Sequence, residues 1–204
     1  MIILTSKGFQ TERGEVLIRK GIKKALKEVG EITPASKTIL LCSPARYGIG
    51  EILLNKTLKF GFDLDNIRLF DGTQSISKFQ PYETFDFCYV GEGNVFEIKD
   101  LLKIAGIDEI IYRSFLNGGT YIGASAGAML SGSTIEFGMD FEANRIGLTD
   151  MSGLNLIKNS VIVPHYSRRE FERWKAASST EINRYEFVDY VPENGYKIYV
   201  NRGV

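Results

Sequence analysis

The chain has 204 residues, of which 44% are hydrophobic and 25% are charged, an ordinary composition for a globular protein. This length predicts one domain over residues 1–204 with a substantial buried core. Lysine plus arginine and aspartate plus glutamate number 25 each, so the sequence has no basic surplus for binding nucleic acid. Its apolar runs fall short of the roughly 18 residues that cross a bilayer, which argues against a membrane partner.

Short apolar runs alternate with helical patterns through the first half of the chain. We expect strands at residues 2–4, 38–42, 67–70, 85–90 and 121–122, and helices at 15–29, 51–60, 95–105 and 107–116. Nearly continuous apolar strands separated by helices indicate a parallel sheet that is covered on both faces. The sequence therefore predicts an α/β fold with a three-layer, doubly wound, mostly parallel sheet.

In the second half, an expected strand at residues 160–163 ends at Pro164-His165, and Ser167 can cap a helix that runs to Ala177. Strands at 187–191 and 196–200 flank a turn signal at residues 192–195. Residues 137–148 show no helical or strand pattern, so we expect an irregular segment there, a hairpin or a flap near the site, which we call the excursion.

Two further features bear on compartment and cofactors. Cys42 and Cys88 each lie at or within a strand-like run, which is typical of reduced core residues in a cytoplasmic protein. One histidine and two cysteines argue against a zinc site, and no organic cofactor is implied. Five basic residues of the first helix are spaced as on a solvated helix face: Arg19, Lys20, Lys23, Lys24 and Lys27.

Sites in parallel α/β sheets form at the C-terminal ends of strands. Residues 43–50, 91–94 and 124–127 all follow expected strands. The last segment belongs to Gly123-Ala124-Ser125-Ala126-Gly127, which fits G-x-S-x-G between a strand and a helix. In that context a tight turn raises the serine oxygen above the sheet, so Ser125 is the candidate nucleophile. A closely packed turn of small residues without catalytic function is the alternative interpretation.

A nucleophilic serine needs a base, and the base needs a group that orients it. His165 is the only histidine in the chain and directly follows an expected strand, so it is the candidate base. The C-terminal ends of two strands of one parallel sheet can meet at a single crevice. Charge alone leaves the orienting acid open, and Glu193 has the best context because it follows a strand. The carboxylates considered are Asp86, Glu92, Glu136, Asp140, Asp150, Asp189 and Glu193.

Four segments in this order, Val90–Phe96, Tyr121–Ala128, Val163–Tyr166 and Val191–Glu193, resemble the peptidase E (aspartyl dipeptidase) family of serine peptidases. That family is related to cyanophycin-degrading enzymes that cleave aspartyl–arginine units. The resemblance implies a fold of the class I glutamine amidotransferase type. It also implies hydrolysis of dipeptides with an N-terminal aspartate.

The resemblance also assigns roles to particular residues. It implies a catalytic triad of Ser125, His165 and Glu193, and an oxyanion hole formed by the backbone N–H groups of Gly93 and Ala126. Asn94 is carried over as a substrate-binding residue. The aspartate-binding arginine of the family corresponds to Arg168 or Arg169, for which an exposed helix face is the alternative interpretation.

The chain departs from the family at Glu92, which interrupts a glycine run; a solvent-facing carboxylate there would leave the Gly93 N–H in place. We expect a cytoplasmic serine peptidase that acts on small peptides without metal or cofactor. An esterase or amidase on the same scaffold, and a binding or regulatory protein without turnover, are the alternatives. The sequence does not choose between a monomer and a homodimer.

Overall fold

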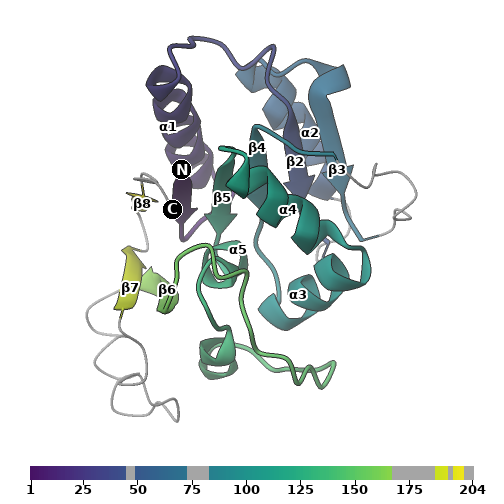
Figure 1. The fold of residues 1–204 in the computed structure, drawn as a ribbon, viewed down its shortest axis with the longest axis vertical. Coiled ribbons are helices and arrows are strands. Elements are labelled where there is room, and N and C mark those ends of the chain that lie inside the picture. Colours follow the sequence, from purple (N-terminus) through teal and green to yellow (C-terminus); the bar gives the residue numbers. More distant parts are fainter. Residues whose placement is uncertain (45–48, 73–82, 167–186, 193–194, 200–204) are drawn as a thin grey trace.

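The computed structural model describes residues 1–44, 49–72, 83–166, 187–192 and 195–199. Its largest sheet has six strands in the spatial order β3-β2-β4-β5-β1-β8 (Figure 1). The strands are β1 (Ile2–Thr5), β2 (Ile39–Cys42), β3 (Ile67–Phe70), β4 (Phe87–Val90), β5 (Thr120–Ala124) and β8 (Tyr196–Tyr199). Five of them run parallel, and β8 pairs antiparallel with β1 at one edge. The C-terminal ends of the five parallel strands therefore lie along the same end of the sheet.

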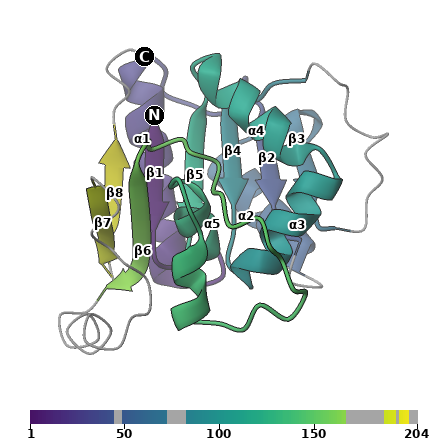
Figure 2. The same cartoon turned by 60° about the horizontal axis from the view of Figure 1, so that its bottom comes forward.

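Helices cover both faces of this sheet (Figures 1 and 2). One face carries α1 (Glu12–Glu28) and α2 (Ile49–Phe60), and the other carries α3 (Val95–Ile104), α4 (Ile107–Leu116) and α5 (Ala126–Leu130). Short 3-10 helices occupy Leu64–Asn66 and Glu136–Asp140.

The alternation of side chains along the strands divides the core between these two faces. In β1, Ile3 packs with the α1 and α2 side while Leu4 packs with the α3 to α5 side. Ile122 and Tyr121 of β5 divide in the same way. Both faces of the strands are thus buried, which explains why the strands are apolar throughout. The expected three-layer α/β architecture is confirmed.

Two further strands, β6 (Ser160–Tyr166) and β7 (Phe187–Pro192), form a separate parallel pair on the β8 side of the large sheet (Figure 2). The strand expected to end at Val163 therefore continues through His165 to Tyr166, with an irregular register between Val163 and Tyr166. This strand pairs with β7 and is not a member of the large sheet. The helix expected to begin at Ser167 lies outside the described residues.

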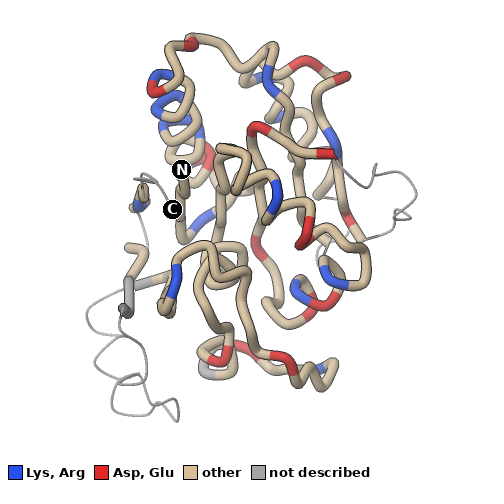
Figure 3. Tube along the Cα trace, in the orientation of Figure 1, with Lys and Arg blue, Asp and Glu red and all other residues tan. Residues whose placement is uncertain are grey.

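Helix α1 illustrates how local sequence sets an element. The Thr11 hydroxyl accepts a hydrogen bond from the Gly14 N–H at 3.0 Å and so caps the N-terminus. Apolar residues such as Ile18 and Ile22 are buried against the sheet. Four lysines are exposed and Arg19 is half-buried, so the basic residues line the outer side of the helix as expected (Figure 3). Within the described residues, no helix combines the length and hydrophobicity that crossing a membrane requires.

Candidate active site

Ser125 lies at the C-terminal end of β5, between the strand and α5. Its backbone has φ 52° and ψ −111°, a conformation that side-chain-bearing residues rarely adopt. Its N–H donates to Thr5 O at 2.9 Å, which fixes the turn to the end of β1. Ser125 is half-buried while Ala124 and Ala126 are buried, so the turn presents the serine toward solvent. This is the strained strand-to-helix turn that the G-x-S-x-G pattern predicts, and residues Gly123–Gly127 are called the elbow below.

The small residues around Ser125 are required by backbone contacts. A Cβ on Gly123 would lie 2.5 Å from Gly127 O, and one on Gly127 would lie 2.1 Å from Val90 O. Larger residues at either position would push α5 away from β4 and β5. The buried hydroxyl of Tyr121 donates to Gly127 O at 2.6 Å and connects the start of β5 to the first turn of α5. Glycines and this tyrosine together hold the elbow against the sheet.

His165 reaches Ser125 from the separate β6–β7 pair. The Oγ of Ser125 and the Nε2 of His165 are 2.8 Å apart, so the contact expected from sequence is present. His165 lies within the irregular part of β6 and has φ 58°, again in the left-handed region. The histidine therefore arrives from a second sheet and through a bulge, and not from a neighbouring strand of the same sheet.

The loop after β4 lies against the elbow. Gly127 N–H donates to Gly91 O at 3.2 Å, which joins the two turns. Gly93 has φ 147°, where only glycine is unstrained, and it lines the same cavity as Ser125. Ala126 is the first residue of α5, and the first N–H groups of a helix have no partner within that helix. Both expected oxyanion donors thus belong to turns that meet beside the serine.

Glu92 does not point freely into solvent. It is half-buried, and its Oε1 accepts a hydrogen bond from the N–H of Gly8, in the loop after β1. Gly8 has no space for a side chain, because a Cβ there would lie 2.5 Å from the hydroxyl of Tyr89. The carboxylate that interrupts the glycine run therefore connects the Gly93 loop to the loop after β1.

Ser125 and His165 line a cavity of about 760 Å³. Its charged lining residues are three acids and two bases: Glu92, Glu97, Glu142, Lys7 and Arg145. Four lining residues come from the excursion expected near the site, namely Phe141, Glu142, Ala143 and Arg145. That excursion begins as a 3-10 helix and continues without strands, so it lies at the site but is not a hairpin.

One acid of this lining also holds the cavity wall together. Glu142 Oε1 accepts from the Val95 N–H at 2.6 Å, at the start of α3. Burial raises the pKa of Glu142, and the hydrogen bond from Val95 opposes that shift. The neighbouring Asn94 accepts from the N–H groups of Phe96 and Glu97 and donates to Ala143 O at 2.9 Å. Asn94 lines the cavity, but both ends of its amide have protein partners.

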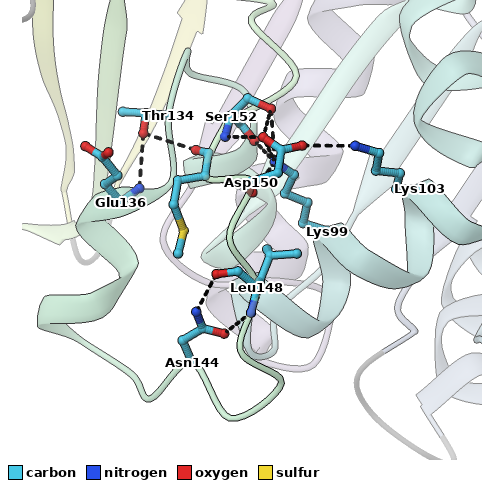
Figure 4. A network of polar contacts seen from close by, with 9 residues as sticks. Lys99, Lys103, Thr134, Glu136, Asn144, Leu148, Asp150 and Ser152 are labelled. Carbon is cyan, nitrogen blue, oxygen red and sulfur yellow. Dashed lines mark hydrogen bonds and ion pairs between the residues drawn. The ribbon is translucent and has the colours of Figure 1, made fainter.

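A polar network fastens the segment that directly follows this excursion, at Asp150 and Ser152, to α3 (Figure 4). The Lys99 side chain is 10% exposed, and its Nζ donates to Asp150 O, Ser152 O and Ser152 Oγ while pairing with the Asp150 carboxylate at 3.0 Å. Lys103 pairs with the other carboxylate oxygen, also at 3.0 Å. The hydrogen bond from the Ser152 side chain contributes most to lowering the pKa of Asp150, and the hydrogen bond from Lys99 is the next largest cause.

The structure narrows the list of orienting acids. Asp86 precedes β4 and accepts hydrogen bonds from Thr38, so it lies at the sheet edge opposite to Ser125. Asp150 is held by Lys99 and Lys103, as described above. Glu193, Arg168 and Arg169 lie outside the described residues, as do the side chains of Asp140 and Asp189. The structure therefore leaves Glu193 as a prediction from sequence.

Sequence reasoning missed the loop after β1, where Ser6 and Lys7 lie near the site. The rule that sites form at strand C-termini would have included this loop, because β1 is parallel to β5. It also missed Glu142 and Arg145 individually, since a charged residue in an irregular segment carries no local signal.

Cys42 and Cys88 are free and buried, and burial raises the pKa of the Cys88 thiol to about 12. Among the described residues, no cluster of side chains could hold a metal ion.

Fold and site together define a doubly wound α/β protein with a contacting serine and histidine at the C-terminal edge of its sheet. A model of peptidase family S51 matches residues 53–201, and the chain belongs to that family. This finding confirms the resemblance to the peptidase E family. The chain is 37% identical over 89 residues to uncharacterized peptidase Lmo0363 of Listeria monocytogenes, a match that covers 43% of each protein. It spans less than half the length of the curated relatives it matches.

Solved structures support the fold. A candidate peptidase E protein from Listeria monocytogenes EGD-e superposes with a TM-score of 0.66 at 22% identity, covering 94% of this chain and 90% of that one. A peptidase from an acI-B1 Actinobacterium superposes with a TM-score of 0.57 at 17% identity, covering 85% and 70% of the two chains. At these identities the likeness concerns the fold, which is of the class I glutamine amidotransferase type.

Proposed function

We propose that this protein is a serine peptidase that hydrolyses small peptides through an acyl-enzyme. The observation that carries the proposal is the 2.8 Å contact between Ser125 Oγ and His165 Nε2, made by a strained serine at the wall of a cavity. The cavity volume of about 760 Å³ falls within the roughly 300–1,000 Å³ of small-molecule sites. Membership of peptidase family S51 supports the same chemistry.

In the proposed reaction, Ser125 Oγ attacks the scissile carbonyl while His165 Nε2 takes its proton. The N–H groups of Gly93 and Ala126 bind the oxyanion, each contributing about 3 kcal/mol of transition-state stabilisation. The imidazolium then protonates the leaving amine. Water next attacks the carbonyl of the acyl-enzyme while His165 takes its proton, and the imidazolium returns a proton to Ser125 Oγ as the acid product leaves. Glu193 holds the imidazole and stabilises its cation. The proposed substrates include dipeptides with N-terminal aspartate, as the family resemblance implies.

Labelling with a fluorophosphonate tests the nucleophile directly. Wild type should become labelled at Ser125, and Ser125→Ala should not. Ser131→Ala is the matched control, because Ser131 is a buried serine at the other end of α5 and should leave labelling unchanged. An unlabelled wild type, folded and with its site intact, would instead favour a binding or regulatory protein.

A substrate panel then separates the enzyme classes. Dipeptides with acidic, neutral and basic N-terminal residues are compared with a p-nitrophenyl ester and a simple amide. The proposal expects the highest kcat/KM on a dipeptide. Turnover of the ester with no peptide cleaved would establish the esterase alternative, which the Ser125–His165 pair supports equally well by itself.

A further inference from the structure

Ser6 is the first residue after β1, and its hydroxyl joins three segments that are distant in the sequence. Ser6 is completely buried. The hydroxyl accepts a hydrogen bond from the His165 N–H at 2.7 Å and donates one to Val191 O at 2.9 Å. These partners are 159 and 185 residues away in the chain. One buried hydroxyl thus connects the large sheet to both strands of the β6–β7 pair.

The backbone that Ser6 contacts is under strain. His165 has φ 58° and lies where the register of β6 shifts, between Val163 and Tyr166. A bulge leaves a residue outside the regular ladder, and its backbone groups need partners elsewhere. A left-handed conformation at a non-glycine residue persists only where the surrounding structure holds it. The Ser6 hydroxyl supplies such a constraint at the residue whose ring contacts Ser125.

The end of β1 holds both members of the serine–histidine pair. Thr5 O accepts the Ser125 N–H at 2.9 Å, and the adjacent Ser6 accepts the His165 N–H. Two consecutive residues therefore fix the backbones on the two sides of the 2.8 Å contact between Ser125 and His165. Through Val191, the same hydroxyl also fixes β7 two residues before Glu193.

We propose that Ser6 is a positioning residue that sets the His165 imidazole against Ser125 through its bridging hydroxyl. This inference rests on the proposed function, since it assigns Ser6 a part in that reaction. A hydroxyl suits the position because it accepts one hydrogen bond and donates another. Alanine would leave the His165 N–H and the Val191 carbonyl without this partner. Cysteine would nearly keep the shape of serine but is a weak donor and a weak acceptor.

Ser114 offers a closely matched control at the opposite edge of the sheet. It is 1% exposed, and its hydroxyl accepts from the Phe85 N–H at 3.0 Å and donates to Ile110 O at 2.7 Å. Its hydroxyl therefore also accepts from one backbone N–H and donates to one backbone carbonyl, although that carbonyl belongs to its own helix, α4. The N–H that it accepts precedes β4, away from the C-terminal ends of the strands, so Ser114→Ala should lose stability without affecting the site.

The test compares Ser6→Ala, Ser6→Cys and Ser114→Ala in the full chain. Because the protein has one histidine, the NMR signals of the His165 ring are unambiguous and can be followed against pH. We expect both Ser6 variants to shift these signals and their titration and to lower kcat by about 10-fold to 100-fold, with KM changed less than about twofold. Ser114→Ala should keep the ring signals and kcat of wild type.

A folded Ser6→Cys variant with wild-type kcat and wild-type ring signals would overturn the proposal, even if Ser6→Ala did not fold. Equal changes of the ring signals in Ser114→Ala would also overturn it, because they would mark a general loss of packing. If wild type cleaves no peptide in the panel, the proposed function fails separately. The ring signals of the Ser6 variants would still decide whether Ser6 positions His165.

Discussion

Replacing Ser125 by glycine should give a more stable protein than replacing it by alanine, although both variants lack the nucleophile. With φ 52° and ψ −111°, Ser125 occupies a region that glycine adopts readily and alanine does not. Both replacements remove the same hydroxyl and its contact with His165. The difference in their free energies of unfolding therefore reports the backbone strain at Ser125, offset by the greater freedom of glycine in the unfolded chain.

The size of this difference follows from two opposing effects. Strain in a sparsely populated backbone region costs about 1–3 kcal/mol, and glycine relieves it. Glycine also gains more conformational freedom in the unfolded chain, which costs about 0.5–1 kcal/mol relative to alanine. We therefore expect Ser125→Gly to exceed Ser125→Ala by about 1 kcal/mol, equivalent to about 2–4 °C in Tm for a chain of this size.

Urea and thermal unfolding measure the difference, with Ser131 as the control position. Ser131 has φ −68° and ψ −21°, and its hydroxyl donates to Ala128 O, a bond that both replacements would lose. There the order should reverse, with glycine about 0.5–1 kcal/mol less stable than alanine. If glycine were also the less stable replacement at Ser125, the elbow would not be strained and the reasoning would be refuted.

Three further changes test other parts of the molecule. Asp150→Asn should lower the free energy of unfolding by about 1 kcal/mol at pH 7, because the Asp150 side chain is 43% exposed and solvent weakens its ion pairs. The lowered pKa of Asp150 means that its contribution is present above about pH 4 and lost as the pH falls further, so urea unfolding of variant and wild type should converge in acid. Glu193→Gln should lower kcat while a bound dipeptide analogue keeps its Kd; unchanged rates would assign the orienting role to another group. If Arg168 or Arg169 binds a substrate carboxylate, alanine at that position should lower kcat/KM for Asp-Leu about 10-fold to 100-fold and leave Ala-Leu unchanged, and the absence of any change in that ratio would remove both arginines from the site.

The sequence by itself determined the elements of the large sheet and the elbow, because both depend on neighbouring residues. Apolar runs such as Phe87–Val90 are buried on both faces and so read as strands. The elbow depends on Gly123 and Gly127, whose missing side chains allow backbone contacts within a few residues of Ser125. Such requirements leave a pattern in the amino-acid order, and the pattern predicted the structure.

Only the tertiary structure decided how the histidine reaches the serine. His165 comes from the β6–β7 pair through a bulge, and Ser6 fixes its backbone across 159 residues of sequence. Glu92 likewise connects to Gly8 across 84 residues. A hydrogen bond between distant segments imposes no period and no fixed spacing on the sequence, because any chain path that brings the two groups together satisfies it. The sequence could not predict these contacts, because they depend on how the large sheet and the separate β6–β7 pair bring the ends of β1, β4 and β6 close to Ser125.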